Sequence, residues 1–585
     1  MKYWRCASST RAPKISFTTA SPMTAPITIA TTAKTLSHAG RREAGYGAAA
    51  TVVPKRGSLS PAGQRVQPRP GLASTAVRLR GAVAAAAIRC VIRGAADLSR
   101  LDRAARACVV AGLVLMAGLI VWIELMPPGF DSIRGLNPFA AAEWRSRFHL
   151  PAAAPSARAY RAWFQVWQVA VWVPYGVLVA IVFRGARLTG RWTWRLGVPV
   201  VVVVAFAMPA ALSTDVFAYV GYARLAVVHG LNPHVATQVD LVRLGDPTSP
   251  YLHWPIASPY GPLWTMLCIA VVAVGERLSA GSVWGTVVVL KLIAAAGVLG
   301  MAAFARRLVP RDEAAGRGDA TFVLVVTNPL LLCEGPGTGH NDVVMMALAL
   351  AGFAAWLAPA PGGQRRVRAA LAFGGAAAVK LIPLLILPWL ATSAARSKDS
   401  GGRLGPAPTP SRVARTAAIL AAIMALGLAP VVVSYAPFWA GGQALGGLAQ
   451  RWRQGGGAVG SEEVTREQSG AVRAANPAVV SVPGQARTQM ARLVEAARRI
   501  WVALLVYVAA TAAILLREGD PLLPLTAWAY VAWSIMLFVA GLWFPWYLAW
   551  TWPTVLVRSN RHHQALALLL FLFSVLLMMV YGTAP

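Results

Sequence analysis

Residues 105–126 read ARACVVAGLVLMAGLIVWIELM, a run in which apolar side chains follow one another almost without interruption. About 20 such residues form a helix long enough to cross the hydrocarbon core of a bilayer. Comparable runs recur from this point to the C-terminal end of the chain. They predict an all-α, polytopic membrane protein.

The composition supports the same fold class. Of the 585 residues, 57% are hydrophobic and 13% are charged, and the five cysteines form no CxxC pair or Cys/His metal spacing. A soluble chain of this length would form several domains, each enclosed by a charged surface. The share of charged residues in this chain is too small to cover the surfaces of several soluble domains. The composition therefore excludes a secreted disulfide scaffold, a coiled coil and a soluble Rossmann or TIM-barrel enzyme.

The excess of basic residues is explained by membrane topology. There are 55 Lys and Arg against 22 Asp and Glu, which gives a net charge of +33. Residues 1–100 hold 16 of the basic and two of the acidic residues, and most of the remaining basic residues stand in short loops between apolar runs. The positive-inside rule produces this distribution. We therefore expect membrane lipids as partners and no nucleic acid.

Residues 1–100 differ in composition from the rest of the chain. They are rich in Ala, Arg, Ser, Thr, Gly and Pro and show no sustained apolar period. Such a segment cannot bury a core. We predict a disordered, basic cytoplasmic tail, or translated upstream sequence from a start codon assigned too early, and a transmembrane domain over 101–585.

A shortened chain tests this prediction. A chain that begins near residue 98 is expected to insert into the membrane and to keep its activity, because the deleted residues contribute no core. Membrane fractionation followed by an activity assay measures both properties. Loss of both would contradict the prediction.

Fourteen apolar runs are candidate membrane spans. They are 105–126, 160–183, 195–212, 262–278, 282–305, 320–334, 341–358, 367–379, 381–394, 413–434, 499–516, 521–541, 544–557 and 563–582. Arginine-rich turns between them, such as those at Arg184, Arg365 and Arg558, belong in the cytoplasm by the positive-inside rule. Residues 127–158, 213–261, 435–496 and 541–546 then face outward.

An even number of spans conflicts with this placement, because a cytoplasmic Arg558 requires an odd number. Either one candidate within 262–305 is re-entrant, or 367–394 form one long helix that contains Lys380. The second choice would move residues 335–342 to the cytoplasmic side. We expect the first, which keeps more arginine inside and gives about 13 transmembrane helices, with interfacial helices in the outward loops.

The outward loop after the third run begins with STDVFAYVGYARLAVVHGLNPH, residues 213–234. A carboxylate where a span meets the interface is costly unless water or a partner meets it, which marks Asp215 as a functional candidate. In a helix, Asp215, Tyr219, Tyr222 and His229 share one side, and an apolar side could rest on the membrane. Ser213-Thr-Asp215 capping an ordinary interfacial helix is the alternative.

A second polar group lies in NPLLLCEGPGTGHND, residues 328–342. Ionisable residues at a membrane boundary indicate a functional site. The sequence therefore nominates Glu334, His340, Asn341 and Asp342. A polar turn between two helices is the alternative.

Other candidates stand alone. Tyr260 lies in SPYGPLW at the entry of a run, where prolines and aromatic residues are common. Lys380 would reach an interface or bind a lipid phosphate. Arg451 and Arg453 offer forked donors for phosphate oxygens, or lie in a solvated loop. Trp546, in WFPWY, belongs to an aromatic belt or stacks on a sugar.

These segments together resemble a known family. The motifs are Asp215-Val-Phe-x-Tyr219 with Gly230-Leu-Asn-Pro233, Pro259-Tyr-Gly-Pro-Leu263, Asn328-Pro-Leu330, Gly339-His-Asn-Asp342 and Lys380-Leu-x-Pro383. In this order they resemble the polyprenol-phosphomannose-dependent α-1,6-mannosyltransferases of the GT-C superfamily, over roughly residues 105–582. The sequence departs from the family at Asn232-Pro-His234, where Pro-Tyr is frequent, and in its basic tail.

The resemblance implies a GT-C-like bundle and a transfer reaction. Its donor would be a sugar, mannose by the resemblance, on polyprenyl phosphate. The acceptor would be a glycan or glycolipid of the cell envelope. Asp215 would be the general base of an inverting transfer on the extracytoplasmic side of the plasma membrane. The cations Lys380, His340, Arg451 and Arg453 could stabilise the leaving phosphate. Tyr219, Tyr222 and Arg224 join them as substrate-binding candidates.

No cofactor is implied, because the lipid-linked donor is itself a substrate, although the sequence leaves a divalent metal open. We find no GxGxxG, P-loop or HExxH motif in a suitable context. A transporter or flippase for a lipid-linked glycan is the alternative function, because intramembrane charges such as Lys380 and Glu334 suit it as well.

Overall fold

The structure is a computed structural model, and it describes the following residues of the chain. They are residues 100–124, 157–186, 188, 192–208, 213, 215–249, 256–279, 283–313, 316–359, 362–396, 410–447, 489–516, 520–539 without 521, and 545–581. Within these stretches the regular elements are all helices. The tail predicted for residues 1–100 lies outside the described residues, apart from Arg100.

Five of the described helices are long and apolar enough to cross a membrane. They are α2 (Arg100–Glu124), α4 (Ala157–Phe183), α9 (Val283–Leu308), α15 (Pro410–Tyr435) and α21 (Arg561–Tyr581). Helix α10 (Arg317–Val326) and α11 (Pro329–Leu332), which runs on into η3 (Cys333–Gly337), are together long and apolar enough as well, and a bend of 52° separates them. The predicted all-α, polytopic fold class is confirmed.

The remaining candidate spans hold elements that are shorter or whose apolar part is shorter. They are α5 (Trp192–Ala207), α12 (Asp342–Leu357), α13 (Gly362–Val379), η4 (Ile382–Ile386), α14 (Leu387–Arg396), α18 (Gln489–Leu516), α19 (Leu523–Ser534), η7 (Ile535–Val539), η8 (Pro545–Trp550) and α20 (Trp552–Val555). Five of these apolar segments have 10–17 residues, so the predicted number of about 13 transmembrane helices stays a prediction. Three more helices, α6 (Asp215–Val227), α7 (Gln238–Arg243) and α8 (Pro262–Ser279), lie between α5 and α9.

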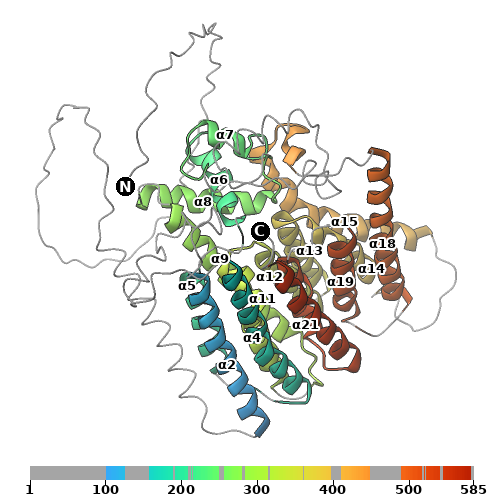
Figure 1. Ribbon diagram of the computed structural model, residues 1–585. Coiled ribbons are helices and arrows are strands. Elements are labelled where there is room, and N and C mark those ends of the chain that lie inside the picture. The colour runs from blue at the N-terminus through green and yellow to red at the C-terminus, as the bar shows by residue number, and fades with distance from the viewer. Residues whose placement is uncertain are drawn as a thin grey trace, which may run out of the picture. The chain divides into compact units, whose positions relative to one another are not determined.

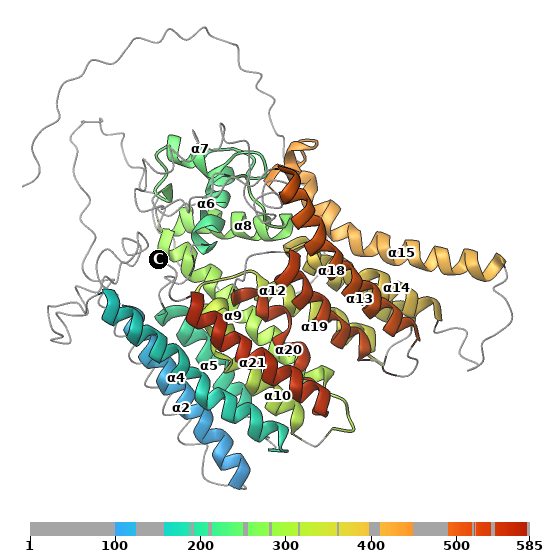
Figure 2. The same cartoon turned by 45° about the vertical axis from the view of Figure 1, so that its right-hand side comes forward.

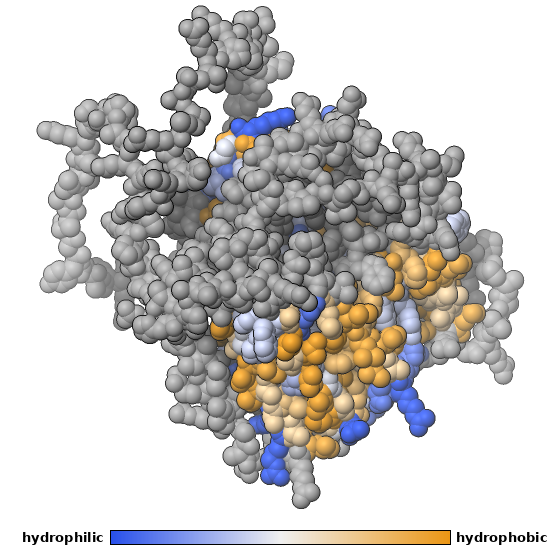
Figure 3. Space-filling view, in the orientation of Figure 1, coloured by the Kyte–Doolittle hydropathy of each residue, from blue (hydrophilic) through white to orange (hydrophobic). Residues whose placement is uncertain are grey.

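The apolar helices pack into one bundle. Helix α2 pairs with α4, while α12 packs against both α9 and α13, and α13 in turn contacts α15 (Figure 1). Apolar side chains also cover the outer surface of the bundle, for example Val432, Val433 and Leu505, which are 65–70% exposed. Figure 3 shows this surface as a broad hydrophobic band with hydrophilic residues at its lower rim. An apolar outer surface of this kind suits contact with lipid.

One end of the bundle is rich in arginine. Arg317 donates to the carbonyl oxygen of Leu556 at 3.0 Å, and Arg558 forms an ion pair with Asp520 at 2.6 Å. Arg306, near the C-terminal end of α9, pairs with Asp319 at 2.7 Å. Helix α13 starts from the same end, because α12 leads into it and its first turns carry arginines. We call this the arginine end.

The opposite end holds the polar residues nominated above. Lys291 in α9 donates to the carbonyl of Met208, the residue that follows α5. Lys291 and Leu308 are 17 residues apart in one helix, which corresponds to about 25 Å at 1.5 Å per residue. Helices α5 and α13 run from the arginine end and finish at this level, and the broken segment of α10, α11 and η3 reaches it at η3. We call it the site end.

Helix α8 begins and finishes at the site end. Just before it, the backbone N–H of Gly261 donates to Val379 at 3.1 Å, and near its end Glu276 pairs with Arg224 of α6. Both ribbon views show α8 lying across the direction of α9 (Figure 2). This placement supports a segment within 262–305 that does not cross the bundle. The alternative, one continuous helix over 367–394, is wrong because the chain turns at Lys380 between α13 and η4.

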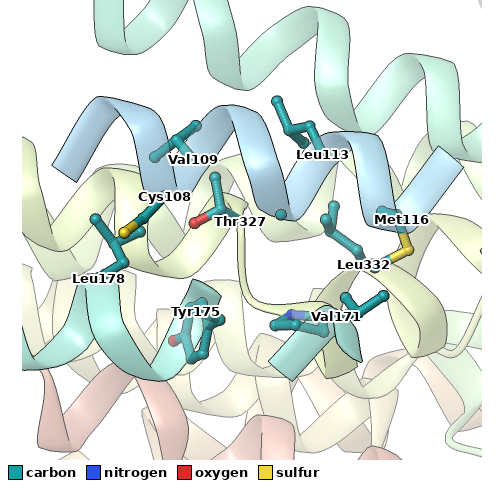
Figure 4. Close-up of a pocket in the computed structure, with 11 residues that line it drawn as sticks. Cys108, Val109, Leu113, Met116, Val171, Tyr175, Leu178, Thr327 and Leu332 are labelled. Atoms are coloured by element: carbon teal, nitrogen blue, oxygen red, sulfur yellow. The ribbon is translucent and has the colours of Figure 1, made fainter. Parts of the chain in front are cut away.

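The Asn328-Pro motif explains the break between α10 and α11. Asn328 caps α11 by accepting hydrogen bonds from the N–H groups of Leu330 and Leu331, and its amide donates to the Tyr175 hydroxyl at 2.8 Å. The broken helix therefore keeps its polar groups paired. Beside the break, α2 and α4 leave a small apolar pocket, in which Tyr175 and Thr327 face residues of α2 (Figure 4).

Candidate active site

Helix α6 brings Asp215 to the site end. Asp215 is its first residue, and its backbone N–H donates to the Ser213 hydroxyl at 3.3 Å. Residues 215–225 are all buried, and α6 packs against α8 and α9. The expectation that this helix rests at the interface with one side on the membrane is therefore wrong. A helix that is buried on every side is held in place by its neighbours.

His340 stands between two carboxylates. Its Nδ1 is 3.5 Å from Asp215 Oδ2, and its Nε2 is 3.3 Å from Glu334 Oε2. The ring is completely buried and stacks on Trp546, with 4.1 Å between the ring centroids. Neither ring nitrogen has a partner in hydrogen-bond geometry among the described residues. The two contacts are therefore ion pairs between the ring and the carboxylates. His340 thus links α6 to the turn before α12.

The two carboxylates also control the charge of the ring. Burial favours the neutral imidazole, but the contacts with Asp215 and Glu334 outweigh it and raise the pKa of His340 to about 9. The ring is therefore a cation at neutral pH. This cation lies 3.5 Å from the Asp215 carboxylate.

A second charged pair lies in the same cluster. Lys380 Nζ is 2.7 Å from Asp342 Oδ1, and Trp550 Nε1 donates to the same oxygen at 2.6 Å. The ammonium also lies over the ring of Tyr547, 4.5 Å from its centroid. Asp342 is buried and Lys380 is 23% exposed. The cation can therefore be reached while its partner cannot.

Tyr219 joins the two pairs. Its hydroxyl donates to Asn341 Oδ1 at 3.4 Å, and the carboxylates of Asp215 and Asp342 both act on it electrostatically. Tyr260 packs edge-on against Tyr219, with ring centroids 4.6 Å apart. The nominated residues from α6, from the turn before α12 and from the turn at Lys380 therefore form one site.

Two glycines allow the backbones to approach. A Cβ on Gly261 would overlap the carbonyl of Ala378, so only glycine lets this segment donate to Val379, next to Lys380. Gly339 has a φ of +81°, a conformation that favours glycine, and it precedes His340. The sequence Gly-His-Asn-Asp thus forms a tight turn that presents three polar side chains together.

The structure brings most of the nominated residues into this site. They are Asp215, Tyr219, Tyr260, Glu334, His340, Asn341, Asp342, Lys380 and Trp546. The remaining two phosphate-binding candidates, Arg451 and Arg453, lie outside the described residues.

Three residues on α6 and after it have other partners. The Tyr222 hydroxyl donates to the carbonyl of Ile256 at 2.8 Å. Arg224 pairs with Asp246 at 3.0 Å and with Glu276, and His229 is 2.8 Å from Asp246. The expected single row of Asp215, Tyr219, Tyr222 and His229 is thus divided between the site and a structural network around Asp246.

Sequence reasoning missed Lys291, Tyr547 and Trp550. Lys291 is a lone cation in an apolar run, the same signal that singled out Lys380. Tyr547 and Trp550 are three residues apart, which is one turn of the 3-10 helix η8, and their ring centroids are 4.6 Å apart. Within the described stretches, no group of three or more His, Cys, Asp or Glu residues could hold a metal ion.

The helices and this cluster define a class of protein. It is a multi-pass membrane protein with a reachable carboxylate and a reachable cation at one end of its bundle. Residues 152–396 match the family described as alpha-(1->6)-mannopyranosyltransferase, N-terminal domain. The resemblance to α-1,6-mannosyltransferases is thereby confirmed over these residues, which make up less than half of the chain.

No curated protein matches the chain. The oligosaccharyltransferase of Archaeoglobus fulgidus, solved in the apo form, is similar in structure, with a TM-score of 0.31 and 13% sequence identity. The match covers 63% of this chain and 56% of that one, so this chain spans less than two thirds of its length.

Proposed function

We propose that this protein transfers a mannosyl residue from polyprenyl phosphate to a glycan or glycolipid acceptor, with inversion, and that Asp215 is the general base. The observation that carries the proposal is a difference in exposure among three clustered carboxylates. The side chain of Asp215 is 12% exposed, whereas those of Glu334 and Asp342 are 1% exposed. Only Asp215 can meet an acceptor hydroxyl.

The reaction follows from these positions. Asp215 accepts the proton of the acceptor hydroxyl while that oxygen forms a bond to the anomeric carbon. The bond from the anomeric carbon to the phosphate oxygen breaks on the opposite face, and polyprenyl phosphate leaves with the electron pair. General-base assistance of this kind contributes about 10²–10⁴-fold to a rate. Buried His340 does not reach the substrate and instead orients Asp215.

Lys380 is the cation for the leaving group. Its side chain is the more exposed member of its pair with Asp342, and its position over the ring of Tyr547 limits its movement. A preorganised cation stabilises the charge that develops on a leaving phosphate. Because the donor brings its own phosphate and Lys380 supplies a positive charge, we propose that no further cofactor is needed.

Radiolabelled polyprenyl-phosphate-mannose tests the proposal. With the purified protein and a panel of glycan and glycolipid acceptors, we expect label in one acceptor class, with an anomeric configuration opposite to that of the donor. A product that retains the donor configuration would contradict a single displacement with Asp215 as base.

The proposed orientation rests on the two ends of the bundle. Arginines gather at the end opposite to Asp215, and the positive-inside rule assigns that end to the cytoplasm. The site end then faces the extracytoplasmic side of the plasma membrane. A lipid-linked donor exposed on that side needs no nucleotide, which agrees with the lack of a nucleotide-binding motif in the sequence.

Cysteine labelling tests this orientation. Thr338 in the site is completely buried, so a probe belongs at Leu231, which is 38% exposed beyond the end of α6. In a chain whose native cysteines are replaced, Leu231→Cys should react with an impermeant maleimide from outside. The matched variant Arg561→Cys, at an exposed position of the arginine end, should react only after permeabilisation. The reverse pattern would contradict the orientation.

A further inference from the structure

Lys291 is a buried cation that the reaction scheme above does not use. It lies in the membrane-spanning helix α9, and only 4% of the residue is exposed. A charged side chain at such a position is costly unless a polar group meets it. Its ammonium donates to the carbonyl of Met208, at the C-terminal end of α5, where helix carbonyls attract positive charge.

The same lysine touches the turn that carries His340. A Cβ on Gly339 would lie 3.4 Å from Lys291 Cγ and 3.1 Å from Val216 Cγ2. The turn therefore packs closely on Lys291 and on Val216, the residue that follows Asp215. Met208 packs on the turn as well, because a Cβ on Gly337 would overlap its sulfur.

We propose that Lys291 is a positioning residue that keeps Asp215 and His340 in register. Through Met208 it fixes the point from which the chain runs seven residues to Asp215, and through Gly339 it supports the backbone next to His340. The inference rests on the proposed function, since it assigns Lys291 to the geometry of the proposed base. A misplacement of 1 Å at a reacting group can cost about 10²-fold in rate.

Replacing the lysine tests its role. Lys291→Met keeps the volume and removes the donor, and we expect kcat to fall about 10-fold or more while KM for the lipid-linked donor stays within 2-fold. Lys291→Arg restores a donor and should recover kcat to within about 3-fold. If Lys291→Met impairs folding, Lys291→Gln keeps a polar group at this position. Its kcat should lie between those of the Met and Arg variants. Thr321→Val removes a buried polar group at the arginine end of the bundle, away from the site, and it should leave kcat unchanged.

Combination with Asp215→Asn separates positioning from a general structural effect. In that background Lys291→Met should lower the remaining rate by less than about 2-fold, because there is no base left to position. The same loss in both backgrounds would overturn the inference, as would an unchanged kcat of the single variant or a raised donor KM. If Asp215→Asn alone stays near the parent rate, the proposed function fails. If it loses activity and Lys291→Met does not, only this inference fails.

Discussion

Asp215→Asn is expected to lower the turnover rate by about 10²-fold or more, while the protein reaches the membrane in normal amounts and still binds the lipid-linked donor. The amide keeps the shape of the side chain and cannot accept a proton at neutral pH, so the variant loses general-base assistance alone. Turnover with labelled donor, beside a donor-binding assay, measures both properties.

The capping alternative gives the opposite result. An Asn cap is about as good as an Asp cap, so a structural role for Asp215 predicts nearly unchanged activity. In the structure the Ser213 hydroxyl already accepts the N–H of Asp215, and the Asp215 carboxylate contacts His340. Turnover of Asp215→Asn within a few-fold of the parent would contradict its role as base. Ser213→Ala is the matched control for a lost cap, and it should keep the rate within a few-fold.

Lys380→Met is expected to lower kcat/KM for the donor by about 10²-fold, because one preorganised charge at a developing anion is worth about this much. The change also leaves Asp342 buried with Trp550 but without its cation. Breaking a buried ion pair costs about 3–5 kcal/mol of stability. We therefore expect a lower Tm together with the lower activity.

The double variant Lys380→Met/Asp342→Asn separates these two effects. It removes the unpaired charge and should regain most of the Tm, but it should not regain donor turnover, since the cation is still missing. Recovery of activity along with stability would contradict the role of Lys380 at the phosphate, and would make the pair purely structural.

Local patterns in the sequence were enough to predict the membrane helices and the segments that form the site. Apolar runs predicted each described membrane helix, and arginine placement predicted a segment within 262–305 that does not cross. Asp215 and the Gly339–Asp342 turn were found because polar residues at the ends of apolar runs are costly. Each of these signals lies within one short segment of the chain.

Contacts between distant segments could not be predicted in this way. Asp342 and Lys380 are 38 positions apart, and their pairing depends on how α12 packs against α13. Arg224 was predicted to bind substrate, yet in the structure its charge is paired with Asp246 and Glu276. Lys291 stands in an apolar run as Lys380 does, and only the end of α5 beside it reveals its partner.

The measurement that most directly tests the central claim follows labelled polyprenyl-phosphate-mannose in sealed liposomes that contain the purified protein and an acceptor. The account predicts that label moves covalently to the acceptor with the parent protein, and about 10²-fold more slowly with Asp215→Asn. Label that crosses the membrane still attached to its lipid, at equal rates in both proteins and without labelled acceptor, would contradict the account and indicate a transporter.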